Sequence, residues 1–221
     1  MPEFLYRPLY NDKGHMLAIR RPNGTRRARG LLQKGVRQHL FCEPCEQHFN
    51  EHFEKPFLRQ WTPSPLPDPW DVDGVQALTV DYAPFKLFHL SVLFRAAVSS
   101  LAAYADVDIG SHEPVLRQRL LERNPGARLE YPIAGRAVIH HRTRHIVPII
   151  TQASVCTIES HRYFSMVYGG VEWWIKLSSH RHRRFEETFL HTDGRMSIGA
   201  VPWTNVPAIQ RASAALRKRP R

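Results

Sequence analysis

Two cysteines three positions apart are the residues best suited to metal chemistry in this chain. Cys42 and Cys45 form a Cys-x-x-Cys pair, and His48 and His52 extend it to Cys-x2-Cys-x2-His-x3-His. Zinc favours four nitrogen or sulfur ligands in a tetrahedron. The spacing is very short, however, and Cys45 and His48 would share a helix face that must also point at Cys42. The alternatives are a zinc site that includes Cys42 and Cys45, completed locally or by other residues, and two free thiols beside a helix.

Lysine and arginine gather in segments suited to contact with phosphate. The chain carries a net charge of +11, and its basic residues concentrate before residue 60 and beyond residue 136. Clustered cations bind nucleic acid by releasing counterions from it, whereas the alternative is a solvated basic surface. The residues expected to bind nucleic acid are Arg20, Arg21, Arg26, Arg27, Arg29, Lys34, Arg37, Arg181, Arg183 and Arg184, with Arg217-Lys-Arg219 continuing the second cluster.

Other familiar catalytic patterns are missing from the sequence. It has neither a glycine-rich phosphate loop nor a Gly-x-Ser-x-Gly elbow, and Cys156 lies in a strand pattern where a small core residue is the simpler interpretation. Three cysteines do not form a disulfide framework, so we expect a reducing compartment and a cytoplasmic protein. The apolar runs fall short of the roughly 18–20 residues of a membrane span, and no signal peptide is expected.

The elements that position the cysteines are predicted to be a hairpin and a helix. Turn residues at Pro22-Asn23-Gly24 separate short strands around Met16–Arg20 and Thr25–Leu31. Aromatic residues then recur every four positions, which predicts a helix from Glu43 to about Phe53. Pro56 is expected to end or bend this helix because proline lacks the backbone N–H that the next turn requires.

A proline-rich segment and two helices are predicted for the middle of the chain. Residues 61–70 contain four prolines and two tryptophans, which is typical of a linker that packs across a surface. Asp81 is the expected N-cap of a long helix whose residues 85–103 are apolar almost all round, as in a buried helix. A second helix is expected from about Glu113 to Arg123, before the breaker Asn124-Pro125-Gly126.

Strand patterns dominate the remainder, so the predicted fold class is α+β with central buried helices and a C-terminal antiparallel sheet. Trp173 and Trp174 are adjacent in a strand, so their rings must point to opposite faces of the sheet. The predicted divisions are residues 1–60, a packed linker at 61–80, and a body at 81–221 that ends in a basic helix over Ala208–Arg219. The predicted strands are Ile146–Ile150, Ser154–Ile158, Tyr163–Tyr168, Val171–Leu177, and a hairpin of Phe185–Leu190 with Met196–Ala200.

Several segments together resemble a known group of proteins. They are Pro2-Glu-Phe-Leu-Tyr-Arg7, the residues 35–50 around the cysteine pair, the residues 85–100, and the residues 107–113. This combination resembles bacterial HNH-like proteins of the endonuclease type, which are built on a treble clef. In that group one Cys-x-x-Cys precedes a Ser-His-x-x-Pro element and a second pair follows, so the resemblance implies a zinc ion held by four cysteines and a hairpin-plus-helix element at the N-terminus.

The sequence departs from that group at its catalytic residues. Pro2 matches the proline of Ser-His-x-x-Pro, which puts the histidine and the first cysteine pair before Met1. We therefore expect either a later start than in the relatives or a lost zinc knuckle. Glu46 stands where active enzymes have a histidine, and their asparagine is replaced within Val36-Arg37-Gln38. A nuclease needs a general base and a divalent metal, so the resemblance implies an incomplete centre that would use Mg²⁺ only if other residues complete it.

Two hypotheses about function follow from these observations. The first is a nucleic-acid-binding protein derived from HNH endonucleases, with DNA as the expected partner and, by analogy alone, a role in defence against foreign DNA. It would be an enzyme only if upstream residues or a partner supply the missing base. The second is a non-catalytic binding or assembly module with a relic treble clef, which would act through a protein partner or a homo-oligomer.

Overall fold

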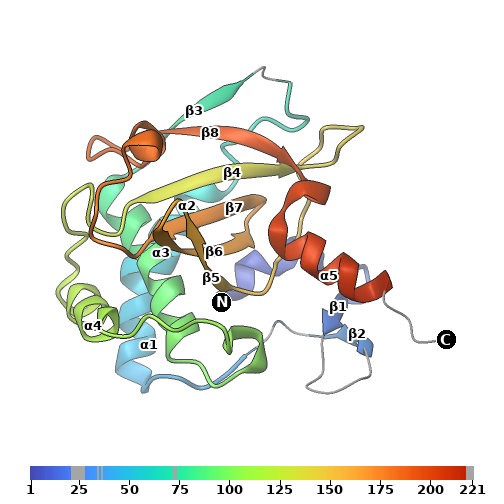
Figure 1. The fold of residues 1–221 in the computed structure, drawn as a ribbon. Coiled ribbons are helices and arrows are strands. Elements are labelled where there is room, and N and C mark those ends of the chain that lie inside the picture. The colour runs from blue at the N-terminus through green and yellow to red at the C-terminus, as the bar shows by residue number, and fades with distance from the viewer. Residues whose placement is uncertain (21–27, 34, 36, 72–73, 218–221) are drawn as a thin grey trace.

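The computed structural model has an α+β fold with one large sheet and a separate hairpin (Figure 1). It describes residues 1–20, 28–33, 35, 37–71 and 74–217, and side chains at 18–20, 28–29 and 214–217 lie outside that description. Strands β1 (Met16–Arg20) and β2 (Ala28–Leu32) pair antiparallel, so the predicted hairpin is confirmed. The treble-clef assignment of this region stays a prediction.

The helix that follows the cysteines is longer than predicted. Helix α1 (Glu43–Phe49) continues through a π-helical segment (Asn50–Glu54) into α2 (Lys55–Trp61). The expected end near Phe53 is therefore wrong. The N–H of Lys55 bonds to the carbonyl of Asn50, five residues back, and this wider turn makes room for the ring of Pro56 at the start of the next α-helical segment.

The central and C-terminal helices lie close to their predicted positions. Helix α3 begins after Asp81 and spans Tyr82–Ala97, and its residues 85–96 are all buried, as its apolar pattern indicates. Helix α4 spans His112–Glu122 and ends at Arg123, which adopts the left-handed conformation. Helix α5 spans Pro207–Arg217. The basic residues at 218–219 lie outside the described residues.

The large sheet is mixed, which corrects the predicted antiparallel sheet. Its six strands lie in the order β3-β8-β4-β7-β6-β5, and β8 runs parallel to β4 while every other neighbouring pair is antiparallel. The chain reaches β8 after the β5–β6–β7 meander and returns to the free edge of β4. The strands are β3 (Val75–Thr79), β4 (Ile133–Ile139), β5 (Ser154–Ile158), β6 (His161–Tyr168), β7 (Val171–Lys176) and β8 (Arg195–Pro202).

Two predicted strands are not among the strands of this sheet that the structure describes. Residues 146–150 form only an isolated bridge between Ile139 and Ile146. Residues 183–188 are a 3-10 helix, so β8 has no hairpin partner there and pairs with β3 and β4 instead. Strand β3 lies within the segment interpreted as a linker. These expectations failed because local pattern does not say which sheet edge is available for pairing.

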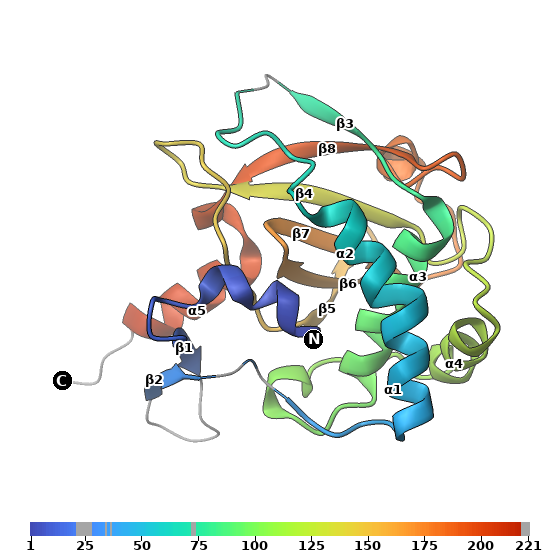
Figure 2. The ribbon, with the colours of Figure 1, turned by 180° about the vertical axis from the view of Figure 1, so that it is seen from behind.

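Helix α3 lies between the sheet and the α1–α2 helix (Figure 2). The rings of Phe57 and Phe88 stack with centroids 3.8 Å apart, and Trp173 of β7 meets Phe85 at 5.7 Å. Buried apolar residues from Leu5 to Ile198 form one contiguous cluster. The divisions at residues 60 and 80 stay predictions, although the α1–α2 helix crosses the first of them.

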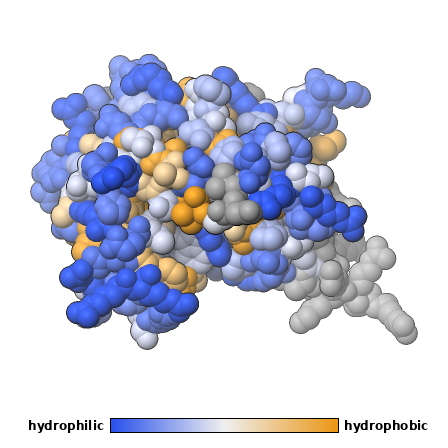
Figure 3. All heavy atoms as spheres, turned by 90° about the horizontal axis from the view of Figure 1, so that it is seen from above, coloured by the Kyte–Doolittle hydropathy of each residue, from blue (hydrophilic) through white to orange (hydrophobic). Residues whose placement is uncertain are grey.

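The surface above β3 and β8 shows apolar atoms only in small separate patches (Figure 3). Val75 on the edge strand β3 is 60% exposed, the most of any large apolar residue on the sheet among those described. The Gln76 side chain donates from Nε2 to the carbonyl of Ala77 at 3.1 Å. Strand β3 has only five residues, and a polar side chain occupies one of its carbonyls. Both features limit pairing of this edge with another chain.

We predict that Gly194→Ala undocks β3 from the turn before β8. Gly194 has φ +84°, and a Cβ atom there would lie 1.8 Å from the carbonyl oxygen of Val80, whose N–H bonds to the Gly194 carbonyl. We expect a loss of at least about 3 kcal/mol in the free energy of unfolding, measured by urea titration. Gly14→Ala is the matched control. Gly14 has φ +71°, but an added Cβ atom would meet open space, so the loss in the free energy of unfolding should be about 1 kcal/mol. Equal losses would contradict the role of Gly194.

Candidate nucleic-acid interface

The face of the large sheet that points away from α3, here called the outer face, carries buried and partly buried polar and aromatic side chains. Trp173 is fully buried beneath α3, and Trp174 lies half-buried on the outer face, so the predicted opposite orientation of the two rings is confirmed. The ring of Trp174 lies beside Tyr163 of β6, with centroids 6.1 Å apart. The outer face therefore presents an aromatic side chain that the main core does not use.

Arg136 covers this tryptophan and neutralises a buried acid. Its guanidinium lies 5.5 Å from the Trp174 ring centroid and donates from Nη2 to Glu172 at 2.6 Å. Glu172 is 1% exposed, whereas the Arg136 side chain is 42% exposed. A stacked, exposed arginine beside an aromatic ring is an arrangement that binds phosphate and bases well.

One predicted basic segment packs at one end of the outer face. His182 is buried and links β6 to an acid: its Nδ1 lies 2.6 Å from the Tyr163 hydroxyl and its Nε2 lies 3.0 Å from Glu159. Burial raises the pKa of Tyr163 to about 12, so its hydroxyl stays protonated at neutral pH. This anchor holds the neighbouring arginines at the rim of the sheet.

The three arginines of that segment are all exposed. Arg181 forms an ion pair with Glu186, and Arg184 forms one with Glu159. Arg183 lies between them and adds to the positive field that lowers the pKa of Glu186, after the larger effect of the hydrogen bond from Arg181. Both partners of the Arg184–Glu159 pair are exposed, and such a pair contributes little to stability, whereas the Glu186 side chain is only 12% exposed and accepts hydrogen bonds from two nitrogens of Arg181.

Helix α5 packs at the other end of the outer face. Its residue Ile209 joins a small apolar cluster with Val138, Val167 and Val201 from three strands. The exposed Arg211 on the same helix donates from Nη2 to Ser154 on β5 at 3.2 Å. The segment 181–184 and Arg211 of α5, which are separate in sequence, therefore share one face of the sheet, with the Arg136–Trp174 pair on the strands between them.

The N-terminal basic cluster is only partly described. Arg20 and Arg29 lie on β1 and β2, whose side chains there are outside the description, and Arg37 forms an ion pair with Glu3. The structure does not bring Arg37 to the outer face, because it lines a cavity beside α3. The other members of the cluster, Arg21, Arg26, Arg27 and Lys34, lie outside the described residues.

The cysteine pair lies at the start of α1. Cys42 is exposed and precedes the helix, and Cys45 is half-buried in its first turn. Hydrogen bonds from the backbone N–H and then the thiol of Cys45 lower the pKa of Cys42, and the same contact raises the pKa of Cys45. His48 donates from Nε2 to the carbonyl of Leu120 at 2.9 Å. Within the described part of the chain no three His, Cys, Asp or Glu side chains are grouped to hold a metal, and zinc stays a prediction.

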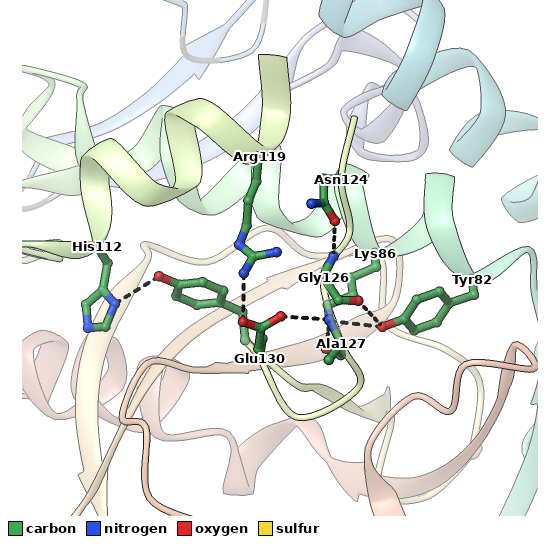
Figure 4. Close-up of polar contacts among 9 residues, drawn as sticks. Tyr82, Lys86, His112, Arg119, Asn124, Gly126, Ala127 and Glu130 are labelled. Carbon is green, nitrogen blue, oxygen red and sulfur yellow. Dashed lines mark hydrogen bonds and ion pairs between the residues drawn. The ribbon is translucent and has the colours of Figure 1, made fainter. Parts of the chain in front are cut away.

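A buried lysine forms a second polar cluster on the other side of the sheet (Figure 4). Lys86 is 1% exposed and donates from Nζ to the carbonyl of Ala127 at 2.7 Å and to the hydroxyl of Tyr82 at 3.1 Å. Burial, with Arg119 nearby, lowers the pKa of Lys86 to about 7. Arg119 of α4 pairs at 2.8 Å with Glu130, which lies with Ala127 on the connection between α4 and β4. The cluster fixes this connection on α3.

Sequence reasoning missed Lys86, Arg95 and Arg136. Lys86 and Arg95 are charged residues inside a helix that the apolar pattern predicts to be buried. That conflict was a usable signal, because a buried charge must find a partner. Arg136 carries no such signal, since its importance depends on Trp174 in a neighbouring strand.

No protein-family model, curated protein or solved structure matches this chain. Among the described residues no helix is both long enough and apolar enough to cross a membrane.

We predict that Lys86→Met changes how stability depends on pH. The folded chain releases the Lys86 proton near pH 7, whereas the unfolded chain holds it to its ordinary pKa of 10.5. Raising the pH from 7 to 9 should therefore stabilise the wild type relative to Lys86→Met, by up to about 1.4 kcal/mol per pH unit. Urea titrations of both proteins at pH 7, 8 and 9 measure this difference. The exposed Lys55, replaced by Met, is the control for loss of a surface lysine. Parallel pH profiles for wild type and Lys86→Met would contradict the assignment.

Proposed function

We propose that this protein binds nucleic acid through the outer face of its large sheet. The proposal rests on one arrangement: the basic segment 181–184 and Arg211 of α5 are on the same face of the sheet, on either side of the Arg136–Trp174 pair. Phosphates of the backbone are expected at the two basic segments. A base or sugar is expected at the Arg136–Trp174 pair, whose ring is partly buried. Stacking contributes about 1–3 kcal/mol for each base.

The charge balance of this face favours a polyanion. Arg183 and Arg211 carry no carboxylate ion pair among the described contacts, Arg184 has an exposed one with Glu159, and Arg181 pairs with the largely buried Glu186. A phosphate chain can bind all four cations at once, whereas each carboxylate neutralises a single one. Release of condensed counterions adds free energy that a small anion cannot supply.

Binding without cleavage is the form of the proposal that the described residues support. The resemblance to HNH-like endonucleases supplies DNA as the expected nucleic acid, and Glu46 stands where active enzymes of that group have a histidine. Zinc at Cys42 and Cys45, and Mg²⁺ for an active nuclease, stay predictions of the same resemblance. The alternative, an assembly module that binds protein, would use the same outer face without any preference for phosphate.

We predict that Arg183→Glu combined with Arg211→Glu weakens binding to a fluorescein-labelled DNA strand of mixed sequence. The slope of log K against log salt is negative, and each lost phosphate contact should reduce its magnitude by about 0.7 for a single strand and about 0.9 for a duplex. Fluorescence anisotropy over a series of salt concentrations measures both affinity and slope, and running single-stranded and duplex probes in parallel shows which form the surface prefers.

The matched control changes the same charge elsewhere. Arg117 on α4 has a side chain that is 60% exposed and pairs with Glu113. The double variant Arg117→Glu with Arg59→Glu changes the net charge by the same amount, and Arg59 is likewise an exposed arginine, on α2, across α3 from the sheet (Figure 2). If this pair of variants loses as much affinity and slope as the outer-face pair, binding depends on net charge alone and the proposed surface is wrong.

A further inference from the structure

A cavity lies on the opposite side of α3 from the outer face of the sheet. It has a volume of about 510 Å³ and is bounded by the first residues of the chain, residues 37–40, the α1–α2 helix and the C-terminal end of α3. Pockets of about 300–1,000 Å³ are the usual size for small-molecule sites. None of the residues proposed to bind nucleic acid on the outer face lines it.

The most unusual side chain of this cavity is Arg95. It is 9% exposed, and its guanidinium lies 4.8 Å from the ring centroid of Phe49. One nitrogen, Nη1, donates to Glu54 at 2.5 Å. The other, Nη2, is buried without a hydrogen-bond partner among the described residues, although Glu46 Oε2 lies 3.5 Å away. A buried donor without an acceptor costs about 1–3 kcal/mol, so this nitrogen favours any acceptor that can reach it.

Glu46 is a weakly held neighbour of that nitrogen. Its side chain is 49% exposed, whereas the Glu54 side chain is 17% exposed and forms the short bond to Arg95. A half-exposed glutamate loses little when it turns toward water. Movement of Glu46 would open Nη2 to the cavity, where an incoming acceptor could form the hydrogen bond that Glu46 does not.

The charges around the cavity restrict the ligand. Arg37 at its edge is already paired with Glu3, and Glu46 and Glu54 both lie close to Arg95. Arg95 and these two carboxylates together carry one net negative charge, and burial lowers the pKa of the nearby Met1 amino group to about 6. A phosphate dianion would therefore meet twice the net repulsion that a single negative charge meets. Val92, Ala96 and Leu101 add apolar wall. The site therefore suits one negative charge attached to an apolar body.

We propose that this cavity binds a small monocarboxylate, whose carboxylate replaces Glu46 at Nη2 of Arg95. The inference is independent of the nucleic-acid proposal, because the two sites share no residue. A neutral amide of the same shape lacks the charge that the guanidinium recognises, and inorganic phosphate lacks the apolar body and carries the excess charge. Ligand binding is therefore expected to follow the order carboxylate, then amide, then phosphate.

The test titrates the full-length protein with benzoate and hexanoate, with benzamide and hexanamide, and with inorganic phosphate, by saturation-transfer NMR at constant ionic strength. Glu46→Gln removes the competing carboxylate, so it should tighten carboxylate binding by about threefold or more. Glu51→Gln is the matched control, because Glu51 is an exposed glutamate of the same helix that pairs with Lys55 outside the cavity. It should leave the affinity unchanged.

Arg95→Lys keeps a positive charge for Glu54 but removes Nη2, so it should abolish the preference for carboxylate over amide. If that variant does not fold, as judged by circular dichroism, the comparison of Glu46→Gln with Glu51→Gln still tests whether the cavity binds a carboxylate. Saturable carboxylate binding that strengthens only in Glu46→Gln supports the site. Absence of saturable binding, equal binding of the amides, or equal effects of the two glutamate variants would each overturn it.

Discussion

The structure depends on the complete burial of α3. A helix that is buried on every side has no water to satisfy its polar side chains, yet this one carries Lys86, His89, Ser91 and Arg95. Each therefore requires an internal partner, at a cost of about 1–3 kcal/mol if none is found. The partners come from three separate parts of the chain: the α4–β4 connection for Lys86, strand β6 for His89, and the π-helical segment for Arg95. These contacts fix how the sheet and the other helices dock on α3.

The same burial divides the surface into two chemically different regions. One side of α3 faces the sheet, so every second strand residue is drawn into the core and its neighbour is left on the outer face. Trp173 and Trp174 are the clearest example, since one supports α3 and the other is left with Arg136. On the other side, the C-terminal end of α3 brings Arg95 to the α1–α2 helix. Arg95 must be paired there, but the available acids satisfy only one of its two terminal nitrogens.

Both proposals use positive charge in different ways. The outer face holds exposed arginines at two ends of the sheet, where the proposed polyanion can contact several of them at once. The cavity holds one buried arginine among carboxylates, where only a compact ligand with one charge fits. The two cases differ because exposed charges are hydrated and the buried one is not. Exposed charges contribute to binding through the number of contacts and counterion release, whereas the buried charge contributes through a single unsatisfied hydrogen-bond donor.

By itself the sequence determined the local features of this protein. Its periodicity indicated the buried helix from Asp81, the β1–β2 hairpin, strands β5 to β7 and the opposite faces of Trp173 and Trp174, because these depend on neighbours a few residues apart. The helix running past Pro56 and the parallel pairing of β4 with β8 depend on distant segments, and only the tertiary structure decided them. The proposed sites combine both kinds of information. The sequence marked Arg181, Arg183 and Arg184 as a cluster, but their place on the sheet and the pairing of Arg95 with Glu54 depend on contacts between residues 19 to 57 positions apart, which no local pattern encodes.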